Sequence, residues 1–365
     1  MIPSETSSTG VYRPDLLPDL PPRSGVAVVR LRSLGDSLLV TPALHQLKQW
    51  RPDLRIAFLV EPAFIPALEH NHDIDELIPV PRDTAGRLQS LLQLRRFQPR
   101  LSVSLHGSST AAWLTQFSGA RWRATFLGLR HTWAHNLLTP PVEPPPGRRS
   151  LHTVEHVLSL FRHLGLPHAP AGPIQLAANP QAQARMRQSL AARGIAGGFA
   201  FIHANPRSFT MRWDARKYID LLTWLWREHG LATVMARHHS MTDEAFEESI
   251  LAGLPDGAGT LITGTNVDDL IALIAESTLV LGSDGGPIHI AAGLQKPVVA
   301  IFSATDVDAW APWQTPSRVV RNPWPCAPCP ADRCYAHAQP ECILSVQIEP
   351  VRQAAAALLH SVTTG

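Results

Sequence analysis

Short apolar runs separated by helical stretches recur in two series along this chain of 365 residues. Buried strands that alternate with helices form parallel sheets, so the pattern predicts an α/β protein with two domains. In the first half, the runs expected to form strands span 26–31, 55–60, 76–80 and 101–105. In the second half they span 199–203, 232–236, 260–263, 278–281 and 297–302.

Two proline clusters, at 139–147 and 167–173, lie on either side of a predicted helix at 151–164. Proline-rich segments interrupt regular structure, so this region is expected to link the domains. We expect a flexible tail at 1–24, an N-terminal domain at 25–172, a second domain at 173–345 and a final helical segment at 346–365. A chain of this length with 45% hydrophobic residues can furnish two cores.

Composition argues against several classes of function. The formal net charge of +2 is too small for general nucleic-acid binding, so no nucleic-acid partner is expected. The first 24 residues lack the apolar core of a secretory signal, and no later segment has about 20 consecutive apolar residues. We therefore expect a cytoplasmic protein, for which peripheral contact with a membrane surface stays open.

A strand, two glycines and a helix follow one another at 278–293, TLVLGSDGGPIHIAAG. Gly285 and Gly286 let a ligand approach the backbone, and the free N–H groups at the start of the helix favour an anion such as a diphosphate. Asp284 is placed to accept hydrogen bonds from sugar hydroxyls, and His289 lies one turn into the helix. The alternative is an ordinary structural turn, with His289 packed in the core.

The same order of strand, turn and helix occurs at 26–44, and it indicates a second Rossmann-like half. Asp36 follows the strand at the edge where parallel α/β sheets bind ligands, which makes it a candidate general base. Aspartate is equally suited to capping the helix that follows. Arg32 in the same turn and His106 after the strand at 101–105 are candidate contacts for an acceptor.

Two further loops follow predicted strands of the second domain. The loop ANPRSFTMRW at 204–213 offers Asn205, Arg207 and Arg212 to a donor molecule. Thr305 and Asp306 follow the last predicted strand, where they either face a ligand or form a cap or turn.

Arginine dominates the segment 82–130, which holds eight arginines and one acid, Asp83. Because guanidinium groups bind acidic groups in a bidentate manner, Arg121 and Arg123 are candidate contacts for an acidic acceptor. The plainer interpretation is a solvated arginine face.

All four cysteines lie in one segment with the spacing C-x2-C-x4-C-x7-C: Cys326, Cys329, Cys334 and Cys342. Four thiolates can close a tetrahedral site for zinc or hold a single iron, and this structural metal is the favoured interpretation. Reduced free thiols are the alternative, and disulfides are less favoured in a reducing compartment.

Taken together, four motifs resemble the ADP-heptose:lipopolysaccharide heptosyltransferases, a family of inverting GT-B glycosyltransferases. The motifs are SLGDS at 33–37 with TPAL at 41–44, DGGPIHIAA at 284–292, KPVVAIF at 296–302 with the Thr305–Asp306 pair, and the cysteine cluster, whose spacing is most similar to the heptosyltransferase III branch.

The resemblance implies two Rossmann-like domains facing a central cleft, with acceptor bound by the first, nucleotide sugar bound by the second, and the final helix crossing back to the first. It also implies transfer of heptose from ADP-heptose to the inner core of lipopolysaccharide, with Asp36 as base and no catalytic metal.

Three positions of the donor site depart from the family pattern or are uncertain in register. Gly285 stands where relatives usually have Ser or Thr, and Met211 where they usually have a lysine that contacts the donor phosphates. Arg212 is the expected substitute for that lysine, and Glu244 or Asp243 for a glutamate near the adenosine.

Three other functions stay open from the sequence. A protein heptosyltransferase would use the same donor with a polypeptide acceptor, and some such relatives carry cysteine-bound iron. A catalytically silent nucleotide-sugar-binding relative is suggested by Met211 and Gly285. A nicotinamide-dependent oxidoreductase is disfavoured, because no G-x-G-x-x-G follows the first strand.

Overall fold

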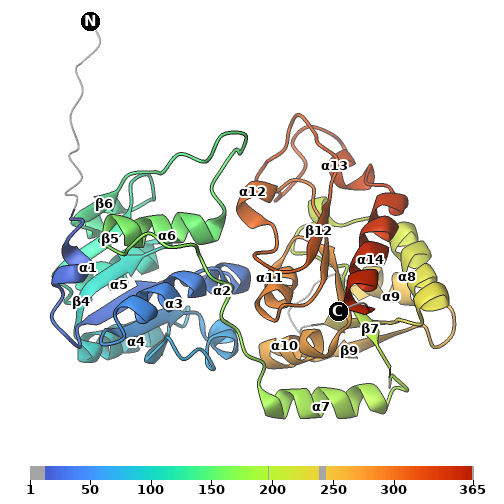
Figure 1. Cartoon of the computed structure of the whole chain (residues 1–365), viewed down its shortest axis with the longest axis horizontal. Coiled ribbons are helices and arrows are strands. Elements are labelled where there is room, and N and C mark those ends of the chain that lie inside the picture. Colours follow the sequence, from blue (N-terminus) through green and yellow to red (C-terminus); the bar gives the residue numbers. More distant parts are fainter. Residues whose placement is uncertain (1–12, 196, 238–243, 364–365) are drawn as a thin grey trace, which may run out of the picture. The chain divides into compact units, whose positions relative to one another are not determined.

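The computed structural model describes residues 13–195, 197–237 and 244–363, which form two compact units (Figure 1). Unit 1 runs to Pro146 and resumes at Thr153–Gly172, and unit 2 comprises Gly147–His152 and the chain from Pro173 onward. Each unit contains a six-stranded sheet. No helix among the described residues is both long and apolar enough to span a membrane.

Both sheets have the same topology. The order is β3-β2-β1-β4-β5-β6 in unit 1 and β9-β8-β7-β10-β11-β12 in unit 2, and every neighbouring pair is parallel. Strand order therefore reverses between β1 and β4 and between β7 and β10, and such switch points form ligand-binding crevices at the carboxyl ends of the strands.

The strands have the following bounds: β1 (Gly25–Val29), β2 (Arg55–Val60), β3 (Glu76–Pro79), β4 (Pro99–Ser104), β5 (Trp122–Phe126), β6 (Leu137–Thr139), β7 (Phe199–His203), β8 (Ala232–Arg237), β9 (Gly259–Thr263), β10 (Leu279–Ser283), β11 (Val298–Ile301) and β12 (Ser317–Val320).

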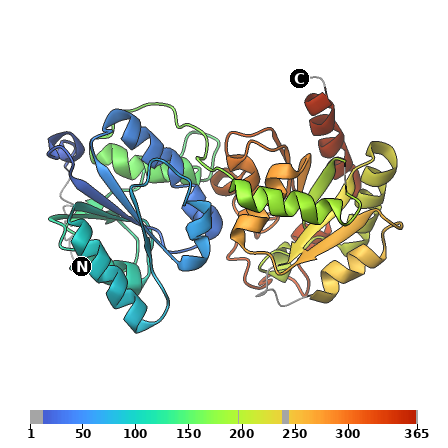
Figure 2. The same ribbon diagram turned by 90° about the horizontal axis from the view of Figure 1, so that it is seen from below.

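Helices cover both faces of the sheet in unit 1 (Figure 2). One face, with Ala27 and Val29 of β1, packs against apolar side chains of α4 and α5, and α3 and α6 lie together on the other face. The helices of this unit are α1 (Leu16–Asp19), α2 (Leu34–Leu38), α3 (Thr41–Trp50), α4 (Thr84–Phe97), α5 (Ser109–Phe117) and α6 (Thr153–His163), with short 3₁₀ helices η1 (Pro62–Ala67) and η2 (Thr132–Ala134).

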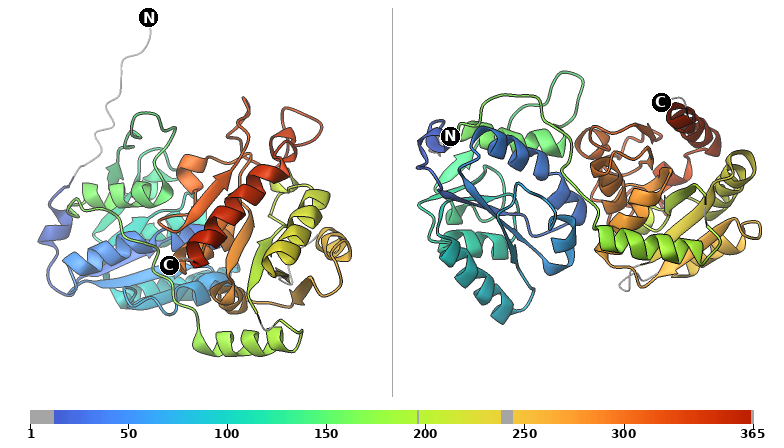
Figure 3. Two further views of the ribbon diagram at one scale, coloured as in Figure 1. Left: turned by 45° about the vertical axis from the view of Figure 1, so that its right-hand side comes forward. Right: turned by 60° about the horizontal axis from the view of Figure 1, so that its bottom comes forward.

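Unit 2 is built in the same way, with α8 and α14 side by side on one face of its sheet (Figure 3). The amphipathic α8 buries Tyr218, Leu221 and Leu225 there, and it ends at Gly230, whose positive φ of 63° suits glycine. The helices of this unit are α7 (Pro180–Ala191), α8 (Ala215–His229), α9 (Glu244–Ala252), α10 (Val267–Glu276), α11 (Gly286–Gly293), α12 (Val307–Trp310), α13 (Glu341–Leu344) and α14 (Ile348–Thr363), with η3 (Phe209–Met211).

The prediction of a flexible tail is wrong for residues 13–24. Leu16, Leu17 and Leu20 are buried, and the Arg51 guanidinium donates hydrogen bonds to the carbonyl groups of Leu17 and Leu20 at 2.7 and 2.9 Å. This short apolar turn is fixed to unit 1 because its leucines fill the core; residues 1–12 of the expected tail lie outside the described part of the chain.

The structure differs from the expected domain division at two further places. Residues 147–152 belong to unit 2, since Arg149 N–H donates to Asp308 at 2.9 Å and His152 stacks on Trp313 at 4.4 Å. The apolar side of α14 is part of the unit 2 core, with Val351 and its neighbours packed against residues of β11 and α8. The final helix is therefore an element of unit 2, whereas the resemblance led us to expect that it crosses to the N-terminal domain.

Candidate functional site

The carboxylate of Asp36 is held at the switch point of unit 1. Asp36 is the third residue of α2, which starts directly after β1, and its Oδ2 accepts hydrogen bonds from the N–H and the hydroxyl of Ser33 at 2.9 and 3.0 Å. Its Oδ1 accepts a hydrogen bond from the Arg30 guanidinium, which also donates to the carbonyl of Leu105. The Asp36 side chain is 17% exposed, so it stabilises the helix start and still reaches solvent.

His106 follows β4 and lies on the other side of the same switch point. Burial lowers the pKa of His106, the nearby Arg30 lowers it further, and the charge of Asp36 opposes this. The imidazole is therefore neutral at pH 7, able to donate one hydrogen bond and accept another.

A pocket of about 270 Å³ lies at the carboxyl ends of the unit 1 strands and includes two of the residues predicted to bind an acceptor, Arg32 and His106. Glu61 in its wall accepts hydrogen bonds from Arg32 and, at 3.0 Å, from Arg82. Burial alone would raise the pKa of Glu61, but these two arginines outweigh it and lower the pKa. Glu61 was not predicted; it could have been found as the polar residue that follows β2. Arg82 is the first arginine of the segment 82–130, which the sequence offered as a surface for an acidic acceptor.

Arg121 and Arg123 do not lie with Arg32 and His106. They flank Trp122, the first residue of β5, at the amino end of the strand, whereas His106 follows the carboxyl end of β4. The Arg123 guanidinium donates to the carbonyl groups of Ala134 and Ala120, and Arg121 stacks over the Trp122 ring. Arg121 and Arg123, which were predicted to contact the acceptor as Arg32 and His106 were, therefore lie at the opposite edge of the sheet from those two residues.

In unit 2, the loop between β10 and α11 lies at the corresponding switch point. Asp284 is buried after the end of β10, Gly285 precedes α11, and Gly286 is its first residue. The first N–H groups of this helix have no partner within the helix, so its start offers donors and a positive dipole to an anion. The predicted elements, strand then helix, are observed here.

His203 is a residue of this site that sequence reasoning missed as a contact. It ends β7, pairs in register with Gly282, and its imidazole Nε2 lies 2.7 Å from where a Cβ atom of Gly285 would be. Burial lowers the pKa of His203 to about 4, so the ring is neutral at pH 7. His203 could have been found from the sequence by its position at the carboxyl end of the central strand β7.

The loop after β7 brings two of the predicted donor contacts together. The Arg212 guanidinium donates to Oδ1 of buried Asn205 at 2.8 Å and lies 4.5 Å from the centre of the Phe246 ring. Its positive charge also lowers the pKa of Glu247, which burial raises more strongly. Arg207 is exposed in the same loop. Arg212 is thus fixed by polar and aromatic contacts near α9.

Two other predicted donor residues, His289 and Asp306, make contacts within unit 2. His289 is buried in α11, with its ring 6.5 Å from that of Trp310. Asp306 caps α12 by accepting from Asp308 N–H, and it also accepts from the Ser150 hydroxyl at 2.9 Å. The cap weighed against a ligand contact for Asp306 is therefore present, and Thr305 beside it is partly buried.

Of the two candidates for the adenosine glutamate, Asp243 lies outside the described residues. Glu244 starts α9, and its carboxylate lies 3.1 Å from the Arg237 guanidinium. Arg237 is buried and also pairs with Glu247 at 2.8 Å. Glu247 is buried, and the charges of Arg237 and Arg212 both act on its carboxylate.

The four cysteines of unit 2 are free thiols that range from exposed Cys326 to buried Cys342. Burial raises the pKa of Cys342, and the other three thiols raise it further, so they lie close enough to interact. Yet nowhere in the described part of the chain do three or more His, Cys, Asp or Glu side chains come together as a metal ion would require. The arrangement therefore does not fit the closed tetrahedral site expected from the spacing.

Two doubly wound units of the same topology, one with an oriented aspartate and one with a glycine loop at a helix start, have the architecture of the GT-B fold. The sequence model described as glycosyltransferase family 9 (heptosyltransferase) matches residues 90–338. The chain belongs to this family.

Individual relatives agree with this assignment. The chain is 30% identical over 292 residues to lipopolysaccharide heptosyltransferase 3 of Escherichia coli K12, covering 78% of this chain and 83% of that protein. Among solved structures, E. coli ADP-heptose lps heptosyltransferase II has the same fold, with a TM-score of 0.75 at 19% identity over 93% of this chain and 99% of the other.

A second similar structure bears on the cysteines. The iron-containing dodecameric glycosyltransferase TibC from enterotoxigenic E. coli H10407 has a TM-score of 0.57 at 15% identity, covering 95% of this chain and 81% of TibC. At this identity the likeness shows the fold alone, and the iron is a property of TibC.

Proposed function

We propose that this enzyme transfers a heptose from ADP-heptose to the inner core of lipopolysaccharide. The relatives named as lipopolysaccharide heptosyltransferases support heptose as the transferred sugar and lipopolysaccharide as the acceptor. The observation that carries the proposal is the Asp36 carboxylate, oriented by Ser33 and Arg30 and partly exposed at the switch point of unit 1.

Asp36 acts as the general base in this proposal. As the acceptor hydroxyl oxygen forms its bond to the anomeric carbon of heptose, Asp36 takes the hydroxyl proton and the bond from that carbon to the ADP oxygen breaks. The products are ADP and a glycosidic bond in which the configuration at the anomeric carbon is inverted. A correctly placed base contributes typically 10²–10⁴-fold to such a step.

Unit 2 holds the ADP part of the donor. The diphosphate is bound by the N–H groups at the start of α11 beside Gly285 and Gly286, where the helix dipole also stabilises the leaving charge. Arg212 replaces the usual lysine at Met211, with Arg207 as a second cation of the loop. Asp284 accepts hydrogen bonds from hydroxyl groups of the donor, and Asn205 accepts or donates such bonds. His289, Thr305 and Asp306 are the remaining predicted residues of this donor site.

Unit 1 holds the acceptor. The pocket that contains His106 presents three guanidinium groups, of Arg32, Arg82 and Arg87, and one carboxylate, of Glu61, so it favours an acidic, phosphate- or carboxylate-bearing sugar chain. Lipopolysaccharide is anchored in a membrane, so we place the reaction at a membrane surface on the cytoplasmic side. No step uses a metal.

Mass analysis of heptose-bearing truncated lipopolysaccharide, after incubation with the enzyme and ADP-heptose, tests this proposal. A gain of one heptose on this acceptor supports it. Transfer to a polypeptide acceptor instead would favour a protein heptosyltransferase, and ADP binding without transfer to either acceptor would favour a silent relative.

A further inference from the structure

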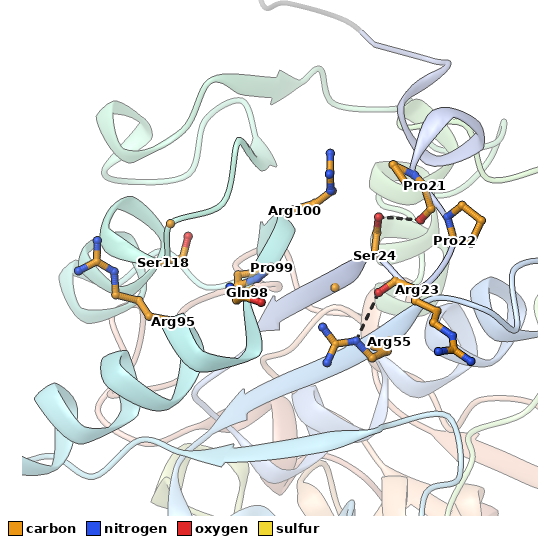
Figure 4. Close-up of a pocket in the computed structure, with 12 residues that line it drawn as sticks. Pro21, Pro22, Arg23, Ser24, Arg55, Arg95, Gln98, Pro99, Arg100 and Ser118 are labelled. Carbon is orange, nitrogen blue, oxygen red and sulfur yellow. Dashed lines mark hydrogen bonds between the residues drawn. The ribbon is translucent and has the colours of Figure 1, made fainter.

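A second pocket of unit 1 takes no part in the proposed reaction. It has a volume of about 580 Å³ and lies at the amino ends of β1, β2 and β4, which begin at Gly25, Arg55 and Pro99 (Figure 4). Asp36 and His106 follow the carboxyl ends of β1 and β4, so this pocket lies at the opposite edge of the same sheet.

The pocket is strongly basic. Four of its twelve lining residues are arginines, Arg23, Arg55, Arg95 and Arg100, and none is acidic. All four are exposed, and in the part of the chain that the structure describes none of them forms an ion pair. The carboxylate of Asp53, which accepts from the Arg23 backbone N–H, is already paired with Arg51 at 2.8 Å. The positive charge here is therefore not balanced by the protein.

One guanidinium is fixed before any ligand binds. Arg55 donates to the Phe97 carbonyl at 3.0 Å and to the Arg23 carbonyl at 3.3 Å, and it stacks over the Phe97 ring at 4.7 Å. Gly25 makes room for this ring, because a Cβ atom there would lie 2.8 Å from Phe97 Cε1. A guanidinium that is held in place loses less conformational entropy when it binds a ligand.

Like charges are also brought together at this edge. Leu101 of β4 pairs with Trp122 of β5, so Arg100 and Arg121 occupy neighbouring positions directly before these residues. Figure 4 shows Arg100 between Arg95 on one side of the pocket and Arg23 on the other. Adjacent like charges repel one another, and an anion bound between them relieves that repulsion.

We propose that this pocket binds a phosphate group, in a ligand that carries at least two negative charges. Several guanidinium groups without a competing carboxylate are suited to bidentate contacts with phosphate oxygens, and the pocket is large enough for a diphosphate or a phosphorylated headgroup. The pocket shares no lining residue with the proposed donor and acceptor sites, so the proposal does not depend on the identity of the transferred sugar.

Pyrophosphate binding, measured by calorimetry in the presence of saturating ADP, tests the proposal in the full-length protein. The double variant R95Q/R100Q is expected to bind pyrophosphate at least tenfold more weakly than the native protein. The matched control is R216Q/R227Q, which removes two exposed arginines of unit 2 and is expected to bind like the native protein. Two results would overturn the proposal. One is that R95Q/R100Q binds pyrophosphate as tightly as the native protein, and the other is that the native protein does not bind pyrophosphate when ADP is saturating.

Sedimentation with phosphatidylglycerol vesicles and with phosphatidylcholine vesicles then identifies the source of the phosphate. Native protein that sediments with the anionic vesicles alone, and loses this in R95Q/R100Q, has a site for lipid headgroups. Pyrophosphate binding without vesicle binding supports a site for a free phosphorylated molecule. Both measurements would give the same result if the protein did not transfer heptose, because neither uses donor sugar or acceptor.

Discussion

The Nε2 atom of His203 occupies the space beside Gly285, 2.7 Å from where a Cβ atom of residue 285 would lie. A side chain at position 285 would meet the buried imidazole, so the glycine and the histidine of this chain are matched to each other. The φ of Gly285 is 166°, an extended backbone that any residue adopts, so the imidazole alone excludes a side chain.

Substituting G285S should therefore weaken ADP binding about tenfold, because the new Cβ and hydroxyl displace the buried imidazole from the loop that binds diphosphate. The double variant G285S/H203A should recover most of this loss, since it removes the clashing ring. Calorimetric ADP affinities of the two single variants and the double variant give the coupling free energy. Additive losses would show that the two residues act independently.

Acid should destabilise unit 2 through His203. Burial lowers its pKa to about 4 from 6.5, so between these pH values the unfolded chain binds more protons than the folded one and stability falls as pH falls. From pH 7.5 to pH 5 the expected loss is about 2 kcal/mol for this group. H203Q should remove that part of the pH dependence.

His135 of unit 1 supplies the matched control, because burial also lowers its pKa to about 4. Urea unfolding of native protein, H203Q and H135Q at the two pH values separates the contributions. The same pH dependence in H203Q as in native protein would mean that His203 is protonated in the folded state near pH 6.

The order of the elements was predictable from the sequence, and several details of packing were not. The alternating apolar runs predicted nine of the strands to within two residues, because buried parallel strands are nearly continuous in apolar residues. β5, β6 and β12 were missed. β5 and β12 carry arginine, and β6 has only three residues, so their apolar signal is weak.

The site residues that lie in one turn of the chain were predictable from the sequence. The contacts between residues of distant segments were missed. Asp36 and the loop at Gly285 follow strands in sequence, so their place at the sheet edge could be inferred. His203 reaches Gly285 only because β7 and β10 are neighbours, which no local pattern encodes. The position of Arg121 and Arg123 at the amino end of β5 could not be inferred for the same reason, because their spacing does not indicate which end of a strand they occupy.

Arg30 should position the base. Its guanidinium donates both to Asp36 and to the Leu105 carbonyl, and a lysine ammonium lacks the planar fork that makes both bonds in one geometry. R30K should lower kcat about tenfold or more with little change in the KM for ADP-heptose, because the donor site is untouched. R216K, at an exposed arginine, is the control, and an unchanged kcat in R30K would remove Arg30 from this role.

The four cysteines should react with iodoacetamide in the order of their exposure. Cys326 is exposed and should be alkylated first, and Cys342 last, because it is buried and burial raises its pKa. Mass spectrometry of timed digests gives the order. Protection of all four thiols until a strong chelator is added would instead demonstrate the structural zinc or iron that their spacing suggested, and elemental analysis would then distinguish the two metals.

The rate of ADP release from ADP-heptose by native protein and by D36N, each with and without heptose-bearing truncated lipopolysaccharide, tests most directly whether Asp36 is the base. Asparagine keeps the shape of the side chain and cannot take the proton. Native protein should release ADP in an acceptor-dependent manner, and D36N should be at least about a hundredfold slower with nearly unchanged ADP affinity. Acceptor-dependent release by D36N at the native rate would show that another group accepts the proton.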